Sequence, residues 1–344
     1  MPTKNKKWGK KIGIRFSYWL ALLLMFLMFL VPQRAVIAKA PEDSFRLFSD
    51  FVAVIAAEGD SFSSLAQKYL KDPALDWVIS DYNEIDTLKP GQALIIPLTQ
   101  QKKGGLTPHG YQTVPVLSYH NFSNSETSRL TVSQAAFEQQ MQFLSERGYR
   151  VIPMDQFFDF LEWKTAIPPK SVVLSIDDGW RSAYEIAFPI LRKHGYPAAF
   201  FIYTDMIGGG QRALSWDMLQ EMAGHGIEVE CHTRSHRNLT LPQQGQSFKE
   251  YFQNMEKELS LSRETIRKKM GREAKYLAYP FGDTSHLVIA LAKKLGFRGA
   301  LTIRRGSNPF FIHNFRVNRS MVYGDFTLTQ FEKNLTVFQS EALR

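Results

Sequence analysis

Apolar runs that alternate with amphipathic stretches constrain the fold of this 344-residue chain more than any other feature of its sequence. Short apolar runs are typical of buried strands, and the stretches between them have the period of helices. Strands that recur between helices favour a mostly parallel sheet. We therefore predict an α/β fold over residues 111–344, a (β/α) barrel that is distorted or has fewer than eight strands. The expected strands are 114–119, 172–176, 198–202, 227–231, 276–279, 299–303 and 315–317, and the expected helices are 133–148, 181–194, 216–225, 248–270 and 284–295.

The amino terminus carries a cluster of cations before an uncharged apolar run at 16–31. The run is short for a membrane span and long for a signal-peptide core, so residues 1–40 are predicted to be a signal peptide or an N-terminal membrane anchor. Either one exports the rest of the chain to the periplasm or cell envelope. The cation cluster before residue 16 supplies six of the nine net positive charges, so we expect no nucleic-acid partner. The single cysteine, Cys231, excludes an internal disulfide.

Residues 51–98 form a compact unit with the predicted order strand, helix, helix, strand. A Gly-Asp-Ser turn at 59–61 precedes the first helix, Asn83 ends the second, and Leu-Lys-Pro-Gly-Gln at 88–92 precedes the last strand. This combination resembles the LysM module, which implies binding to N-acetylglucosamine glycans such as peptidoglycan. The alternative is a degenerate copy that serves only as a folding unit or spacer. Residues 99–110 are polar and are predicted to be a linker.

Two carboxylates and two imidazoles follow predicted strands. Asp177 and Asp178 come directly after 172–176, and His232 and His236 come after 227–231. One Asp and two neutral imidazoles can form an open divalent-metal site, which leaves the other Asp as a base. A zinc protease would carry a Glu between its histidines on a helix, and this chain has none there. Helix capping could explain one Asp, but two adjacent like charges repel unless a cation neutralises them.

Four segments resemble one family. Ser175–Gly179 and His232–His236 resemble the two metal-site motifs of the polysaccharide deacetylases, the NodB-type carbohydrate esterase family 4. Val116–His120 and Ala278–Gly282 are similar to the first strand and third motif of the branch that deacetylates poly-N-acetylglucosamine. The resemblance runs from about residue 113 to 325. It implies a metal-dependent hydrolase that removes acetyl groups from N-acetylglucosamine residues of peptidoglycan or poly-N-acetylglucosamine.

The resemblance also implies roles for individual residues. Asp178, His232 and His236 would bind the metal, most often Zn²⁺, with Co²⁺ or Ni²⁺ as alternatives. Asp177 would take a proton from metal-bound water, and the backbone N–H of Phe281 would stabilise the oxyanion. The further candidates for the substrate pocket are Tyr279, His120 and Arg316.

The chain departs from the family pattern at two positions. The family's Arg two residues before the Pro of the third motif is Ala278 here, and Arg316 or Arg319 is the expected replacement. The late Leu-x-His, whose imidazole protonates the leaving amine, has its nearest counterpart in Phe311-Ile312-His313. His313 is therefore the candidate general acid, with a surface histidine as the alternative.

Three functions remain open from the sequence. The first is an exported N-deacetylase that a LysM-like unit tethers to peptidoglycan. The second is a glycan O-acetyl esterase, because the same metal site can attack esters. The third is a non-catalytic peptidoglycan-binding protein whose barrel has lost activity with the missing Arg. Both Asp and both His residues are present, which favours an enzyme.

Overall fold

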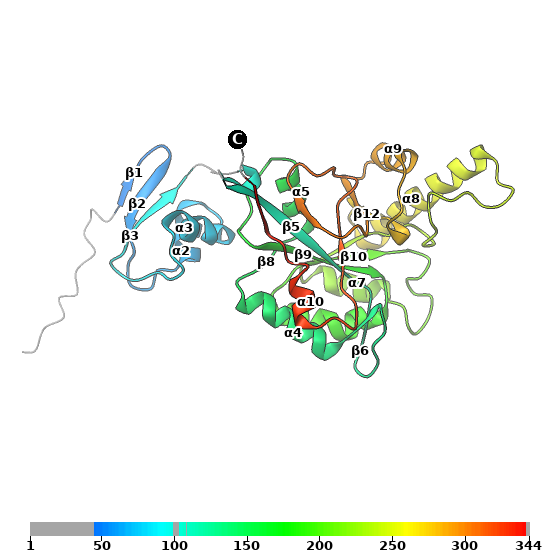
Figure 1. Ribbon diagram of the computed structural model, residues 1–344, viewed down its shortest axis with the longest axis horizontal. Coiled ribbons are helices and arrows are strands. Elements are labelled where there is room, and N and C mark those ends of the chain that lie inside the picture. Colours follow the sequence, from blue (N-terminus) through cyan, green and yellow to red (C-terminus); the bar gives the residue numbers. More distant parts are fainter. Residues whose placement is uncertain (1–44, 99–102, 108, 342–344) are drawn as a thin grey trace, which may run out of the picture.

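The computed structural model describes residues 45–98, 103–107 and 109–341 (Figure 1). The predicted signal peptide or membrane anchor lies outside the described residues, and so do residues 99–102 and 108 of the predicted linker. Within the described ranges, no helix combines the length and the apolar character that crossing a membrane requires.

A curled, mostly parallel sheet forms the centre of the larger domain. Its parallel strands lie in the order β13, β12, β11, β10, β9, β5, which follows the chain from one edge to the other. This confirms the predicted α/β fold with a parallel sheet. Their bounds are β5 (Gly110–Tyr119), β9 (Ser171–Asp178), β10 (Ala198–Ile202), β11 (Ile227–Cys231), β12 (Tyr276–Ala278) and β13 (Gly299–Leu301).

The segment from Val317 to Met321 lies between the two edges of the curled sheet. A parallel bridge joins Val317 to Leu301 of β13, and β15 (Ser320–Met321) pairs with β5. This segment therefore brings late residues of the chain to the same end of the sheet as the carboxyl end of β9. The short strands that extend β5 and β9 are β4 (Leu106–Thr107), β8 (Arg150–Val151), β14 (Ser307–Pro309) and β16 (Phe338–Ser340), and β6 (Asn121–Ser123) pairs with β7 (Thr131–Ser133).

Helices cover the outside of the curled sheet, except for α5, which packs against the apolar cluster inside it (Figure 1). Ser247 caps the longest of them, α8 (Phe248–Met270), in a capping box with Glu250, and Gly271 ends it at φ 70°. The predicted helix over 181–194 is present, and a π-helical turn at Ala183–Ala187 leads into α6 within it. The sequence did not predict α5 and α10. The remaining bounds are α4 (Gln134–Glu146), α5 (Met154–Leu161), α6 (Phe188–His194), α7 (Trp216–Ala223), α9 (His286–Lys294) and α10 (Leu328–Glu332).

Alternation along the strands divides the core into two parts. On β11, Val229 and Cys231 pack with the outer helices, whereas Glu228 and Glu230 point the other way. Val173, Phe201 and the other residues that face the inside of the curled sheet form a separate apolar cluster. Cys231 is thus a small buried core residue.

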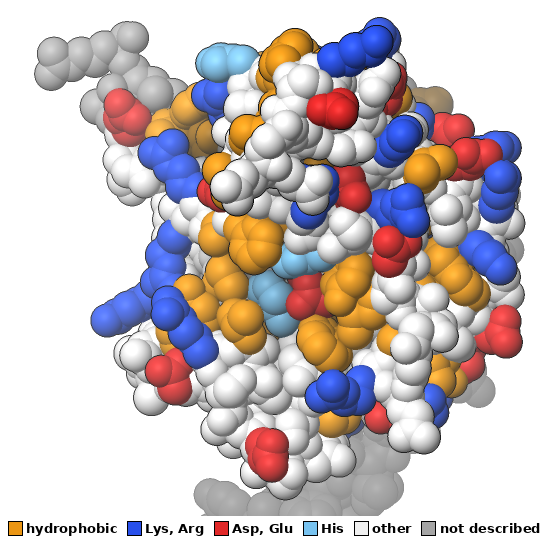
Figure 2. Space-filling model, turned by 90° about the vertical axis from the view of Figure 1, so that its right-hand side faces the viewer, with side chains coloured by type: hydrophobic (Ala, Val, Ile, Leu, Met, Phe, Trp, Pro, Cys, Tyr) orange, Lys and Arg blue, Asp and Glu red, His pale blue; other side chains and the backbone are white. Residues whose placement is uncertain are grey.

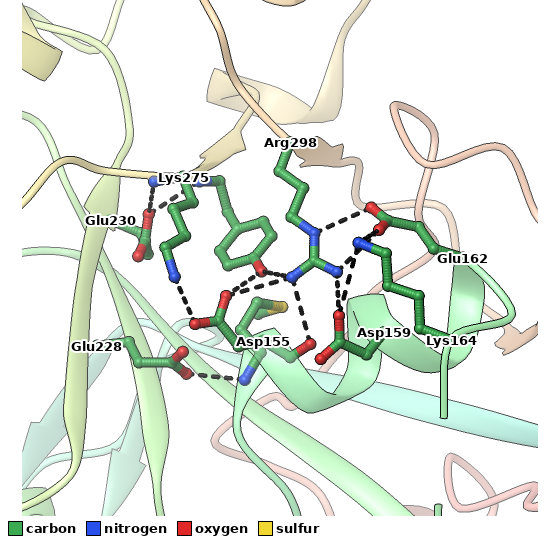
Figure 3. Close-up of polar contacts among 10 residues, drawn as sticks. Asp155, Asp159, Glu162, Lys164, Glu228, Glu230, Lys275 and Arg298 are labelled. Carbon is green, nitrogen blue, oxygen red and sulfur yellow. Dashed lines mark hydrogen bonds and ion pairs between the residues drawn. The ribbon is translucent and has the colours of Figure 1, made fainter. Parts of the chain in front are cut away.

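A polar network closes the amino end of the curled sheet (Figure 3). Glu230 accepts hydrogen bonds from the backbone N–H groups of Lys275 and Tyr276 at 2.7 and 2.8 Å. Arg298 forms ion pairs with Asp159 of α5 and with Glu162, which directly follows that helix. This end of the sheet is therefore sealed by paired charges, and the opposite, carboxyl end is left for chemistry.

The small domain consists of an antiparallel sheet and two short helices. Strands β2 (Phe51–Ile55) and β3 (Ala93–Pro97) enclose α2 (Phe62–Tyr69) and α3 (Asp76–Asn83), and β1 (Phe45–Leu47) adds an edge. The Asn83 amide bonds the carbonyls of Ile79 and Ile95 and the N–H of Ile95, which ties the end of α3 to β3. The strand, helix, helix, strand order is therefore present.

Candidate active site

The candidate site lies where three neighbouring parallel strands end. Asp177 and Asp178 are the last residues of β9, and His232 follows β11 directly. Strand β10 lies between β9 and β11 and pairs with each of them. Its residue Ile202 is in register with Asp178 of β9 and with Cys231 of β11. In Figure 2 histidine and carboxylate side chains lie together at the bottom of a hollow that apolar side chains surround.

Asp178, His232 and His236 come together as a set of metal ligands. Their ligand atoms all lie within 4.8 Å of one another. Asp178 Oδ1 is 3.8 Å from His232 Nε2 and 3.5 Å from His236 Nε2. Two imidazole nitrogens and one carboxylate oxygen with open positions are the donor set of a catalytic Zn²⁺ or similar divalent ion. The predicted ligands therefore fit such an ion.

Neighbouring groups orient two of these ligands. His232 Nδ1 lies 2.7 Å from the carbonyl oxygen of Ala278, which makes Nδ1 the donor and leaves the Nε2 lone pair facing Asp178. Burial lowers the pKa of His232, although the Asp177 and Asp178 carboxylates act in the opposite direction, so the imidazole is neutral as a ligand must be. The Trp180 indole donates to Asp178 Oδ2 at 3.0 Å. No motif in the sequence singles out Trp180.

The backbone at these ligands adopts left-handed conformations. Asp178 has φ 77°, Thr233 69° and His236 60°. Non-glycine residues rarely occupy this region, and each costs of order 1–3 kcal/mol that the surrounding structure must offset. Strain concentrated at three positions of one small site is typical of functional sites.

Asp177 is a buried, ionised carboxylate. It is 1% exposed, and its Oδ1 accepts a hydrogen bond from Arg319 at 2.6 Å. Burial raises the pKa of this carboxyl, but the charge and the hydrogen bond of Arg319 act in the opposite direction, and the pKa lies below its usual value. Oδ2 lies 4.0 Å from Nε2 of both His232 and His120. This free oxygen therefore faces the metal ligands, where a base is needed.

Arg319, not Arg316, is the arginine at the site. Arg319 is fully buried and also donates to the Thr302 carbonyl at 2.9 Å. Arg316 is exposed and its backbone N–H bonds the His313 carbonyl, so the prediction of Arg316 as a site residue is wrong. The sequence offered both arginines, because only the path of the segment after β13 decides which one meets Asp177.

His120 and Phe281 are both brought to the site. His120 follows β5, and its side chain is 14% exposed beside Asp177. Phe281 has φ 61° in the turn after β12, and its backbone N–H has no partner among the described residues. Its ring is 57% exposed and lies 5.0 Å from the ring of His236. An unpaired N–H beside a metal ligand is available to a developing oxyanion.

The structure does not bring Tyr279 into the pocket. Its side chain is fully buried in the core, and its hydroxyl donates to the Phe315 carbonyl at 3.1 Å. The prediction of a substrate contact is wrong because the strand's alternation turns Tyr279 towards the helices. Tyr203 instead lines the site, with its ring 5.3 Å from that of His236.

His313 also lies away from the site. The residues after it run parallel to β13, with the Asn314 carbonyl accepting from Ala300 and Thr302 N–H donating to Val317. His313 is therefore at the amino end of this segment, whereas Arg319 reaches the carboxyl end. Its Nδ1 accepts a hydrogen bond from the Phe315 N–H. The prediction that His313 protonates the leaving amine is wrong for this reason.

Comparison with known proteins agrees with this geometry. Residues 164–300 match the family described as Polysaccharide deacetylase. A poly-beta-1,6-N-acetyl-D-glucosamine N-deacetylase of Staphylococcus aureus is 28% identical over 204 residues, which are 56% of this chain and 70% of that protein. The crystal structure of a polysaccharide deacetylase from Bacillus cereus has a TM-score of 0.54 at 26% identity and covers 72% of each chain.

A further solved structure shows the shared fold. IcaB from Ammonifex degensii has a TM-score of 0.59 at 24% identity, and the match covers 66% of this chain and 99% of that one. The family match includes Asp177, Asp178, His232 and His236, whereas His120 and Arg319 lie outside it. Taken with the ligand set at the strand ends, these similarities relate residues 164–300 to the polysaccharide deacetylases and show that the protein is a hydrolase.

Proposed function

We propose that this protein is a divalent-metal-dependent N-deacetylase of an N-acetylglucosamine polymer. The convergence of Asp178, His232 and His236 within 4.8 Å, beside the buried Asp177–Arg319 pair, carries the proposal. A divalent ion bound there, Zn²⁺ or alternatively Co²⁺ or Ni²⁺, would polarise the acetamide carbonyl and lower the pKa of water. The arginine that the third motif lacks is supplied by Arg319, which removes the main reason to regard the barrel as inactive.

Asp177 is the base in this proposal. Arg319 holds Oδ1 and keeps the carboxyl ionised, so Oδ2 is free to take a proton from the attacking water. The water oxygen bonds to the acetyl carbon, and the carbonyl oxygen gains negative charge. The Phe281 N–H then stabilises that charge, which is worth about 3 kcal/mol for comparable donors.

His120 is the proposed acid. Its Nε2 faces Asp177 Oδ2 from the β5 side, while His232 faces it from the β11 side. When the carbon–nitrogen bond breaks, the glucosamine nitrogen must gain a proton, and His120 is placed to donate it. The products are acetate and a free amine. His313 has no part in this scheme.

The similarity to an enzyme named for poly-beta-1,6-N-acetyl-D-glucosamine favours that polymer over peptidoglycan as the substrate. The exposed Phe281 ring and the half-buried Tyr203 and Trp180 supply aromatic surfaces for sugar rings around the metal ligands. We retain peptidoglycan as the second substrate to be tested.

We further propose that residues 51–98 form a LysM-like glycan-binding domain that holds the enzyme at peptidoglycan. Support comes from the strand and helix order and from a surface pocket on the loop before β3, lined by Asp86, Lys89 and Gln92. Residues 1–40 would direct export or anchor the chain in the membrane, residues 99–110 would link the domains, and the deacetylase domain would span 111–344. These assignments place the protein in the periplasm or cell envelope.

An acetate-release assay tests the proposal. The full chain is incubated with β-1,6-linked N-acetylglucosamine oligomers, with purified peptidoglycan and with an O-acetylated glycan, each with and without chelator. We expect acetate from the amide substrates, loss of release with chelator, recovery with Zn²⁺ or Co²⁺, and no turnover by Asp177→Asn. Release from the O-acetylated glycan alone would instead establish an esterase, and chelator-insensitive release would contradict the metal site.

A further inference from the structure

The turn that carries His232 and His236 is held from outside by α8. Glu258 accepts hydrogen bonds from the backbone N–H groups of Arg234 at 3.2 Å and Ser235 at 2.9 Å, and from Ser235 Oγ at 2.8 Å. One carboxylate therefore satisfies three donors of a five-residue turn. Bonds to an ionised acceptor are roughly twice as strong as neutral ones.

A second residue of α8 holds the start of the same turn. Ser262 lies one helical turn after Glu258 on the same face and donates to the Thr233 carbonyl at 2.9 Å. It also accepts from Cys231 Sγ at 3.3 Å, and both side chains are fully buried. The buried Ser262 and the partly exposed Glu258 thus fix consecutive parts of a turn that contains two left-handed residues, Thr233 and His236.

The two histidines differ in how they are supported. His232 is buried and its Nδ1 bonds Ala278. His236 is more exposed, with 27% of its side chain accessible, and no hydrogen bond to its ring nitrogens occurs among the described residues. Its backbone N–H bonds Thr233 Oγ1 at 3.0 Å. The place of the His236 ring therefore depends on the conformation of the turn rather than on a partner of its own.

We infer that Glu258 is a positioning residue that sets His236 for metal binding. The inference rests on the proposed function, since it presupposes a metal at Asp178, His232 and His236. Without the carboxylate, the strained turn loses the acceptor that favours its left-handed conformation, and His236 samples positions away from Asp178. Glu258 touches neither substrate nor reacting atoms, so its effect is on metal affinity first.

The test is metal affinity of the folded apo protein, measured with Zn²⁺ and Co²⁺ against a competing chelator. Glu258→Ala is expected to raise the metal Kd by about 10-fold or more, and Glu258→Gln by less because the amide oxygen still accepts. The matched control is Glu264→Gln, an exposed glutamate of the same helix whose carboxylate pairs with Lys268 at 2.8 Å. The control should keep the wild-type Kd and the wild-type Co²⁺ absorption spectrum.

A merely structural role for Glu258 would lower the melting temperature without moving the Kd or the spectrum, and that result would overturn the inference. If Glu258→Ala does not fold, Glu258→Gln and Ser235→Ala, which removes only the Oγ bond, provide the same comparison. Failure of the wild-type protein itself to bind Zn²⁺ or Co²⁺ would refute the proposed function. Equal binding by the wild-type protein and the variants would refute this inference alone.

Discussion

Replacing Glu230 by Gln should remove a large part of the pH dependence of stability. Glu230 is fully buried at the amino end of the curled sheet, and burial raises the pKa of its carboxyl from 4.5 to about 8 (Figure 3). The backbone N–H groups of Tyr276 and Lys275 and the charge of Arg272 act in the opposite direction, but they do not offset burial. The folded state therefore holds a proton that the unfolded chain releases.

The sign and size of the pH dependence of stability follow from the difference between the folded and unfolded pKa of Glu230. Because the pKa is higher in the folded state, the stabilising contribution is complete below about pH 4.5 and is lost as the pH rises to about 8. A difference of about 3.5 pKa units corresponds to a loss of about 5 kcal/mol, at 1.36 kcal/mol per unit. Gln is neutral throughout and can accept the same two backbone hydrogen bonds, so its variant should not lose this contribution.

Guanidinium unfolding of both proteins at several pH values between 4.5 and 8 provides the measurement. The free energy of unfolding of Glu230→Gln, minus that of the wild type, should rise by about 1.4 kcal/mol per pH unit. Any constant offset caused by the amide leaves this slope unchanged. A difference that stays flat across the range would show that Glu230 is ionised in the fold and would refute the reasoning.

Three further substitutions test the site. Arg319→Met leaves Asp177 buried without its partner, so we expect the free energy of unfolding to fall by about 3–5 kcal/mol and kcat/KM to fall at least 100-fold. The control Arg316→Met should leave the free energy of unfolding and kcat/KM near the wild-type values. His120→Gln should lower kcat by about 10²–10⁴ with little change in metal Kd, while His313→Gln should leave kcat unchanged. Trp180→Phe removes the indole donor to Asp178, and chelator competition should show a metal Kd raised by about 10-fold. Equal kcat for His120→Gln and His313→Gln, or an unchanged metal Kd for Trp180→Phe, would contradict the assignments.

The sequence predicted the parts of the fold that depend on local pattern. Strands β10 and β11 and helix α8 have the predicted bounds, because β10 is a continuous apolar run, β11 alternates, and α8 has a capping box and a terminal glycine. Helix α5 was missed because the sequence places it directly after a short strand and gives it no side-chain cap. The strand predicted at 315–317 is only an isolated bridge from Val317 to Leu301, because the pairing of this segment depends on how far the sheet curls.

The site residues could likewise be predicted where a local pattern decides their position, and not where the path of an irregular segment decides it. Asp178, His232 and His236 could be predicted because each follows a strand and the carboxyl ends of parallel strands share one edge. Arg316 and Arg319 could not be told apart by motif, since both lie on one irregular segment and only its path decides which of them meets Asp177. Tyr279 was misjudged because the alternation of its strand turns it towards the outer helices with Leu277, whereas Phe281 lies in the turn beyond the strand, where its ring is exposed.

Anomalous X-ray diffraction from crystals of the Zn²⁺-loaded protein tests the central claim most directly. We predict one peak with Asp178 Oδ1, His232 Nε2 and His236 Nε2 each at about 2.0–2.2 Å from the ion. A peak at other residues, or no peak here at saturating Zn²⁺, would contradict the account.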